Sequence, residues 1–181
     1  MSFTQSVKYI TNTLQEVLSN NDSAQIDEVI DYILKAKKVF VYGVGRSGHV
    51  GKGFAMRLVQ LGLKAYFIGE TITPIVEAED AAVIISNTGE TMSAIQTGNI
   101  VRRVGAKVVV VTSNNKSKLA HCANIVVCIP IDDETRETGL APLGTLFEDA
   151  SMIFLDGVIS VLMAKLGETE ESMRGRHAIM V

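Results

Sequence analysis

The sequence is poor in the residues that build disulfides and metal sites. Its 181 residues include two cysteines, Cys122 and Cys128, and three histidines, His49, His121 and His177. Two cysteines do not form the disulfide framework of a small secreted protein, so we expect a reducing, cytoplasmic compartment. The cysteines and histidines are scattered without metal-ligand spacing, and the adjacent pair His121 and Cys122 is too small a ligand set. We therefore expect no metal site.

The sequence also lacks an excess of positive charge and any long apolar run. The net charge is −3 and the pI is about 5.6, which argues against nucleic-acid binding. No apolar segment reaches the length of a transmembrane helix, and residues 1–5 lack the basic start of a signal peptide. The chain has 47% hydrophobic residues, no internal repeat and no low-complexity segment. We expect residues 1–181 to form a single domain that binds neither membrane nor nucleic acid.

Apolar patterning predicts alternating strands and helices. Short β-branched runs predict strands at residues 38–42, 64–68, 81–85, 107–112 and 124–130. Helices are expected at 3–18, 24–36, 49–61, 92–104, near 117–121 and at 142–166. The alternation predicts an α/β fold, a three-layer sandwich around a five-stranded parallel sheet. We expect the flavodoxin-like order 2-1-3-4-5, which puts the first and third strands side by side where ligands bind.

The third predicted strand is followed by a turn rich in hydroxyl groups. The sequence Ser86-Asn87-Thr88-Gly89-Glu90-Thr91 lies between the buried run 81–85 and the helix at 92–104. Free backbone N–H groups and the positive end of the helix dipole favour an anion there, and three side chains add O–H donors. Capping of the helix by Thr88 or Thr91 is the simpler interpretation, but it requires one such residue. Three hydroxyls in six positions favour an anion site.

A glycine-rich turn follows the first predicted strand. Gly43-Val44-Gly45-Arg46-Ser47-Gly48 fits the pattern G-x-G-x-x-G, and Glu70 lies near the end of the second strand, where a ribose-binding acid belongs in a dinucleotide site. Two features count against a dinucleotide. The remaining chain is too short for a separate substrate domain, and a dinucleotide fold has no need of the second hydroxyl cluster. The same glycines would let the backbone approach a sugar phosphate.

The C-terminal part combines an acidic segment with an apolar helix. Residues 131–141 are acidic and polar, and we expect them to form a solvated, mobile loop. The helix at 142–166 is apolar nearly all round, so we expect it to be buried in a core or in a subunit interface. Glu148 near its start is a carboxylate among residues that require burial. The simpler interpretation of Glu148 is that the helix dipole favours a negative charge in the first turn of the helix, without a role in function.

Six segments occur in an order that resembles one enzyme family. They are GVGRSG (43–48), FAMRL (54–58), GETITP (69–74), SNTGET (86–91), PLGTLFE (142–148) and RHA (176–178). Together they resemble the 6-phospho-3-hexuloisomerases, a family in the sugar isomerase (SIS) domain superfamily, from about Lys37 to the end of the chain. The hydroxyl turn is common to SIS domains, whereas the second and third segments point to this family. The chain departs from the family pattern at Asn87, where glycine is usual, and at Ile179, where asparagine is usual.

The resemblance implies a reaction and a set of partners. The family converts D-arabino-hex-3-ulose 6-phosphate to D-fructose 6-phosphate through an enediol, in the ribulose monophosphate route of formaldehyde fixation. No cofactor, a homotetramer and functional coupling to hexulose-6-phosphate synthase are implied, with residues 3–36 and 167–181 as the expected subunit contacts. Two related functions stay open, which are isomerisation of arabinose 5-phosphate and non-catalytic sensing of a sugar phosphate.

The resemblance also implies roles for individual residues. Glu148 is the expected base that moves a proton between C2 and C3, and its pKa should be raised by partial burial. His177, from the same or a neighbouring subunit, is expected to shuttle hydroxyl protons. Glu70 is expected to orient sugar hydroxyls. The residues of the two turns that are expected to hold the phosphate or the sugar are Gly45, Arg46, Ser47, Ser86, Asn87, Thr88, Gly89, Glu90 and Thr91.

Overall fold

Five parallel strands form one sheet. The computed structural model describes residues 1–19, 23–131, 137 and 139–179. The strands are β1 (Val39–Gly43), β2 (Ala65–Phe67), β3 (Ala81–Ile85), β4 (Lys107–Thr112) and β5 (Ile125–Cys128). Their order is β2-β1-β3-β4-β5 and each neighbouring pair is parallel, which confirms the predicted order. β1 and β3 are therefore neighbours, and Gly43 lies opposite Ile85 at their carboxyl ends.

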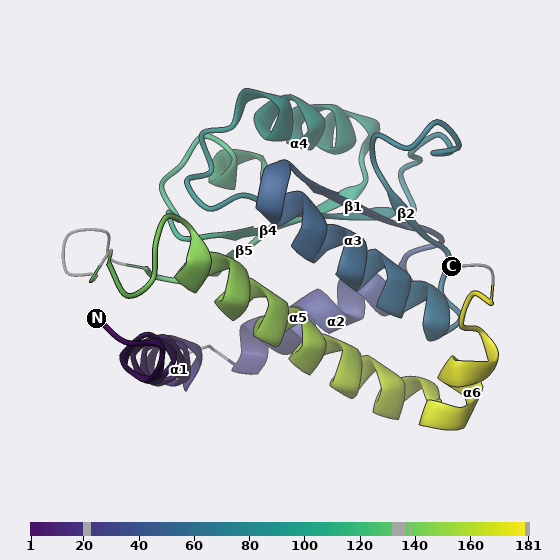
Figure 1. Ribbon diagram of the computed structural model, residues 1–181. Coiled ribbons are helices and arrows are strands. Elements are labelled where there is room, and N and C mark those ends of the chain that lie inside the picture. The colour runs from purple at the N-terminus through teal and green to yellow at the C-terminus, as the bar shows by residue number, and fades with distance from the viewer. Residues whose placement is uncertain (20–22, 132–136, 138, 180–181) are drawn as a thin grey trace.

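Helices cover both faces of the sheet (Figure 1). On one face lie α4 (Met92–Val104) and the 3₁₀ helix η1 (Ala120–Cys122), and on the other lie α2 (Ser23–Lys35) and α3 (Gly45–Gln60). α5 (Thr145–Leu166) packs against α3, α2 and α1 (Phe3–Ser19), and α6 (Glu170–Gly175) follows it. This is the three-layer α/β arrangement that the sequence predicts. None of the helices described is both long and apolar enough to cross a membrane.

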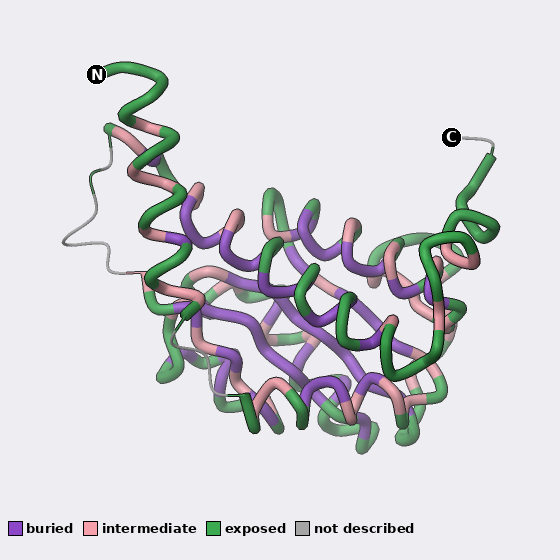
Figure 2. Tube along the Cα trace, turned by 90° about the horizontal axis from the view of Figure 1, so that it is seen from below, coloured by how far each residue is buried: buried purple, intermediate pink, exposed green. Residues whose placement is uncertain are grey.

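The alternation of side chains along each strand builds two separate cores. Val41, Val83 and Val109 are paired across β1, β3 and β4 and point to the face covered by α2, α3 and α5. Phe40 and Ile84 point to the face covered by α4, because successive side chains of a strand face opposite ways. Every residue of β3 is buried, as the continuous apolar run predicts, and Figure 2 shows the strands in purple between the helices.

Helix α3 begins at Gly45, whereas the sequence pattern predicted a start at residue 49. The φ of Gly45 is +58°, which turns the chain abruptly from β1 into the helix. The helix also packs very closely on the strand. A Cβ on Gly43 would lie 2.7 Å from the carbonyl oxygen of Ser47, and a Cβ on Gly48 would lie 2.8 Å from that of Gly43. The glycine-rich turn is therefore short, and its second half forms the first turn of α3.

Helix α5 begins at Thr145, three residues later than the predicted Pro142. The hydroxyl and the N–H of Thr145 both donate to the carbonyl of Pro142, so these residues form a turn before the helix. The helix is buried along one side only, since Met152 and Ile153 are 49% and 50% exposed. The short helix expected near 117–121 is the three-residue η1. In the acidic segment, residues 132–136 and 138 lie outside the described residues.

Candidate active site

A cavity opens where β1 and β3 end, at the switch point of the sheet. Its volume is about 160 Å³. It is lined by Val44, Ser47, Ile85, Ser86, Asn87, Thr88, Thr91 and Ala94. The glycine-rich turn and the hydroxyl turn thus lie beside one crevice outside the carboxyl ends of adjacent strands, which is where open α/β sheets bind ligands.

Two long helices begin at this cavity without side-chain caps. α3 follows Val44 and α4 follows Thr91, and neither of these side chains accepts a hydrogen bond from its helix. The first N–H groups of both helices are left for a ligand or water, and the positive ends of two helix dipoles meet there. The hydroxyl of Thr91 lies 3.4 Å from that of Ser86, and Thr88 Oγ1 accepts the Glu90 N–H at 3.2 Å. Neither threonine side chain caps α4, so the arrangement favours an anion over the capping interpretation.

Contacts from the neighbouring turn fix the shape of the hydroxyl turn. The φ of Gly89 is +66°, and a Cβ there would overlap the side chain of Ser117. The Gly89 carbonyl accepts the Leu119 N–H at 3.1 Å. The Glu90 carboxylate accepts the Lys118 N–H at 3.0 Å and lies 3.0 Å from its ammonium nitrogen, which holds the pKa of Glu90 below its ordinary value. The negative charge in the turn is thereby neutralised by Lys118, and the Glu90 side chain does not line the cavity.

Glu148 pairs with Arg46 next to the cavity. The Arg46 Nε lies 3.1 Å from Glu148 Oε1, and the two side chains are 51% and 16% exposed. Arg46 directly precedes Ser47, which lines the cavity, so the pair lies beside the anion site. Burial raises the pKa of Glu148, the Arg46 cation opposes this rise, and the charge of Asp149 adds to it. The result is a sheltered carboxylate whose pKa lies above its ordinary value.

Gly144 allows this ion pair to form at the start of α5. A Cβ at this position would lie 2.7 Å from Glu148 Oε1 and 3.2 Å from Arg46 Nη2. Gly144 is also the N-cap residue of α5 and offers no side chain as a cap. The N-terminal turns of α3 and α5 are therefore linked through Arg46 and Glu148, and α4 begins at the cavity that Ser47 lines.

Glu70 lies further from the cavity than the two turns. It follows β2 at the edge of the sheet, and its carboxylate is 3.1 Å from Lys52 Nζ. The same lysine lies 5.1 Å from the centroid of the Phe67 ring. Both charged side chains are about half exposed, at 54% and 53%. Glu70 is thus oriented by Lys52 and does not line the cavity.

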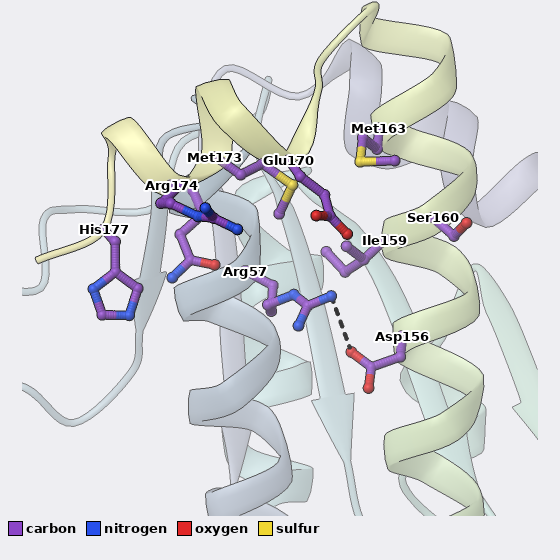
Figure 3. A pocket seen from close by; sticks show the side chains of 10 residues that line it. Arg57, Asp156, Ile159, Ser160, Met163, Glu170, Met173, Arg174 and His177 are labelled. Carbon is purple, nitrogen blue, oxygen red and sulfur yellow. Dashed lines mark ion pairs between the residues drawn. The ribbon is translucent and has the colours of Figure 1, made fainter.

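His177 lines a different pocket, shown in Figure 3. This pocket has a volume of about 480 Å³ and lies between the C-terminal halves of α3 and α5 and the helix α6. In Figure 3, His177 lies beside Arg174 at one end, while Arg57 and Asp156 face each other between α3 and α5. The Arg57 Nη2 is 3.9 Å from Asp156 Oδ1, and the Arg57 Nε is buried without a partner in the structure described.

The position of the tail separates His177 from the anion site within one chain. Arg176 Nη1 donates to the carbonyl of Gln60 at 3.0 Å, which ties the tail to the last residue of α3. Ser47 lies in the first turn of the same helix, so at 1.5 Å per residue the two ends are about 20 Å apart. His177 and Glu148 do not meet in a single chain.

Several residues around the site were not singled out by the sequence. Thr112 and Ser113, at the end of β4, donate hydrogen bonds to Asn87 in the hydroxyl turn. The strand order alone could have indicated them, because β4 ends beside β3. Gly144 was not predicted to be close to Glu148, since this contact depends on how α5 enters the fold. Val44 and Ile85 also line the cavity, but their apolar side chains have no functional group that could have indicated a site in the sequence.

The fold is that of a known family. The SIS domain family matches residues 32–153, and the chain belongs to it. A crystal structure of a hypothetical protein from Methanococcus jannaschii, for which a function of 3-hexulose-6-phosphate isomerase is inferred, has a TM-score of 0.88. It is 32% identical, with 98% of this chain and 99% of that chain covered.

Relatives of similar sequence include named isomerases and a protein without an assigned function. The 3-hexulose-6-phosphate isomerase of Methanocaldococcus jannaschii is 38% identical over 84% of this chain and 82% of its own length. The enzyme of the same name from Bacillus subtilis is 34% identical over 98% of both chains. A protein of Methanothermobacter thermautotrophicus that has no assigned function is 38% identical over 96% of this chain and 98% of its own length.

Proposed function

We propose that the protein is a sugar-phosphate isomerase that converts D-arabino-hex-3-ulose 6-phosphate to D-fructose 6-phosphate. One observation carries the proposal. Two uncapped helix N-termini and a set of hydroxyl groups surround a small cavity, and a sheltered carboxylate paired with an arginine lies directly beside it. The helix N-termini and the hydroxyl groups suit the binding of a phosphate dianion, and the carboxylate suits proton transfer at a carbon next to a carbonyl group. The relatives named 3-hexulose-6-phosphate isomerase support this choice of substrate.

The phosphate would bind in the cavity between α3 and α4. The hydroxyls of Ser47, Ser86 and Thr91 line it and would donate to phosphoryl oxygens, together with N–H groups of residues 87–90. Gly45 and Gly89 would act through the backbone, because their positive φ values give the two turns their shape. A phosphate held there fixes one end of the sugar, so the carbonyl end extends toward a second group.

Glu148 is the proposed base. In the forward reaction its carboxylate takes the proton from C2, the electrons form the 2,3-enediolate, and the same proton is returned to C3, which leaves the carbonyl group at C2. A pKa above the ordinary glutamate value makes the carboxylate a stronger base, and this suits the task. The Arg46 guanidinium keeps the carboxylate ionised and is placed to stabilise negative charge on the enediolate oxygens. The reaction is internally redox-neutral, so no external oxidant or reductant is required.

The hydroxyl proton must also move from the oxygen on C2 to that on C3, and His177 is the proposed shuttle. Within one chain its neighbour Arg176 binds the C-terminal end of α3, about 20 Å along the helix from Ser47, so the shuttle would come from a second subunit. The outer faces of α3 and α5 suit such a contact. Met56 and Met152 are half exposed there and line a groove of about 180 Å³. A copy packed antiparallel along α3 would bring its tail to the anion site.

The expected homotetramer needs further contacts, and α1 offers them. It buries only Leu14, and Figure 2 shows the helix at the N-terminus exposed along most of its length. Phe3 and Val7 on this helix are 84% and 42% exposed. We therefore keep residues 3–36 and 167–181 as the proposed subunit contacts. The substrate would come from hexulose-6-phosphate synthase in the cytoplasm, which couples the two enzymes functionally.

A coupled assay tests the function. Formaldehyde, ribulose 5-phosphate and the synthase generate the substrate, and a detecting enzyme measures fructose 6-phosphate. The protein should accelerate product formation, whereas Glu148→Gln should not. A parallel assay with arabinose 5-phosphate tests the related isomerase. Binding of fructose 6-phosphate without turnover of either substrate would reject the proposed isomerase activity and favour the function of a sugar-phosphate sensor.

Mixing two inactive variants tests whether His177 acts across subunits. Glu148→Gln and His177→Ala are each expected to be inactive or nearly so. When the two are unfolded together and refolded as mixed oligomers, some sites combine an intact Glu148 with an intact His177 from the other chain. Recovery of activity is expected in the mixture. If the mixture stays as inactive as its components, the proposal that two subunits share one active site is wrong.

A further inference from the structure

Asn87 is held by the end of the neighbouring strand β4 in a specific way. Its backbone carbonyl accepts the Ser113 N–H at 2.9 Å and the Thr112 hydroxyl at 2.9 Å. A carbonyl oxygen has two lone pairs, so these two donors satisfy it. The Ser113 hydroxyl lies 2.8 Å from this carbonyl and also 2.8 Å from the side-chain Oδ1 of Asn87. It has only one proton to donate.

The lone-pair count decides where the Ser113 proton goes. Because the Asn87 carbonyl already has two donors, the free acceptor is Oδ1, and the Ser113 hydroxyl donates to it. This fixes the orientation of the planar side-chain amide. Its NH₂ group is then directed away from Ser113, and it makes no hydrogen bond with the residues that the structure describes. Asn87 is also one of the residues that line the anion cavity.

We infer that the Asn87 side-chain amide donates a hydrogen bond to a phosphoryl oxygen of the bound sugar phosphate, and that Ser113 is the positioning residue that keeps the amide in this orientation. The inference rests on the proposed function. Glycine, the usual residue in the family's turn, would offer only its backbone N–H here. The asparagine therefore adds a side-chain donor to the cradle, and Ser113 prevents the amide from presenting its oxygen to an anion.

A double-mutant cycle on the full chain separates orientation from simple support of the turn. The dissociation constants of inorganic phosphate and of fructose 6-phosphate are measured by titration calorimetry for the wild type, Asn87→Ala, Ser113→Ala and the double variant. Asn87→Ala should weaken both ligands about tenfold, the effect of losing one hydrogen bond to a charged group. Ser113→Ala should weaken them roughly threefold or more, because the amide is then free to turn over.

The decisive value is the effect of Ser113→Ala when Asn87 has already been replaced. With no amide left to orient, Ser113→Ala should change affinity by less than about twofold in that background. Thr112→Val is the matched control, since it removes a hydroxyl that donates to the backbone carbonyl of Asn87 and accepts the Asn114 N–H, but does not contact the Asn87 side chain. Its effect should be equal in both backgrounds. Ser113→Thr keeps the hydroxyl, so this variant should bind both ligands with wild-type affinity.

The outcomes distinguish this inference from the proposed function. If Ser113→Ala weakens binding equally in both backgrounds, Ser113 only supports the turn and the inference fails, while the isomerase proposal stands. Unchanged affinity of Asn87→Ala for inorganic phosphate, or a loss confined to fructose 6-phosphate, also overturns the phosphoryl contact. If the wild type binds neither ligand, the proposed function fails and the inference with it. Thermal unfolding of each variant identifies any that is misfolded. If Asn87→Ala is misfolded, Asn87→Asp takes its place. This variant should lose more affinity for phosphate than Asn87→Ala, because its carboxylate would face the phosphate.

Discussion

The conformation of the hydroxyl turn depends on Gly89, and replacement by alanine measures how tightly the turn is built. The φ of +66° costs a residue with a side chain roughly 1–2 kcal/mol. The added Cβ would also overlap the Ser117 side chain, and overpacking of this kind costs about 1–3 kcal/mol. Gly89→Ala should therefore lower the free energy of unfolding by about 2–5 kcal/mol. This is a large share of the roughly 5–15 kcal/mol that holds a typical domain together.

Gly167 supplies a matched control. Its φ is +67°, but a Cβ there would meet no atom within 4 Å. Gly167→Ala should cost only the backbone strain, roughly 1–2 kcal/mol. Urea unfolding followed by circular dichroism compares the two variants at one protein concentration, because subunit association would otherwise shift the midpoints. Gly89→Ala should also weaken fructose 6-phosphate binding, because the hydroxyl turn would lose its shape.

A third variant isolates the overlap itself. Ser117→Gly removes the atoms that the new Cβ would meet, although it also removes the acceptor of the Ala120 N–H. Combined with Gly89→Ala, it should give a protein more stable than the sum of the two single effects predicts. If Gly89→Ala costs no more than Gly167→Ala, and the double variant shows no coupling, the close packing of Gly89 on Ser117 is wrong.

Three further predictions concern the site itself. Glu148→Gln should retain affinity for fructose 6-phosphate in calorimetry and lose about 10²–10⁴ in turnover, as expected for removal of a general base; near-normal turnover would exclude Glu148 from that role. Arg46→Gln removes the cation that opposes the effect of burial, so the pKa of Glu148 should rise further and the acidic limb of the pH–rate profile should move to higher pH, because the base must be ionised. An unmoved limb would mean that another group controls it. Ser86→Ala combined with Thr88→Val should weaken phosphate binding about tenfold or more while the fold is kept, and unchanged affinity would contradict the phosphate cradle.

The sheet could be predicted from the sequence because each strand has a local signal. The apolar, β-branched run 81–85 is short and bounded by polar residues, and the runs at 107–112 and 38–42 behave alike. The alternation of strands with helices then restricts the connections, and the order follows from a common pattern of such folds. The observed order β2-β1-β3-β4-β5 is the predicted one.

The boundaries and the distant contacts could not be predicted in this way. The start of α3 at Gly45 depends on the packing of Gly43 and Gly48 against each other, which is a tertiary effect. The hydrogen bonds from Ser113 to Asn87 join residues far apart in the chain. The pocket that His177 lines depends on how α6 folds back on α3, and no local pattern encodes that path.

In the proposed mechanism, the cavity between α3 and α4 holds the phosphate of a sugar whose reacting carbons lie at Glu148. A crystal structure of the Glu148→Gln variant with fructose 6-phosphate bound tests this most directly, because the ligand is retained without turnover. The phosphoryl group should lie within hydrogen-bonding distance of Ser47, Ser86 and Thr91, with C2 and C3 of the sugar beside the substituted side chain. A phosphoryl group bound elsewhere, or a sugar that extends away from the substituted position, would contradict the account.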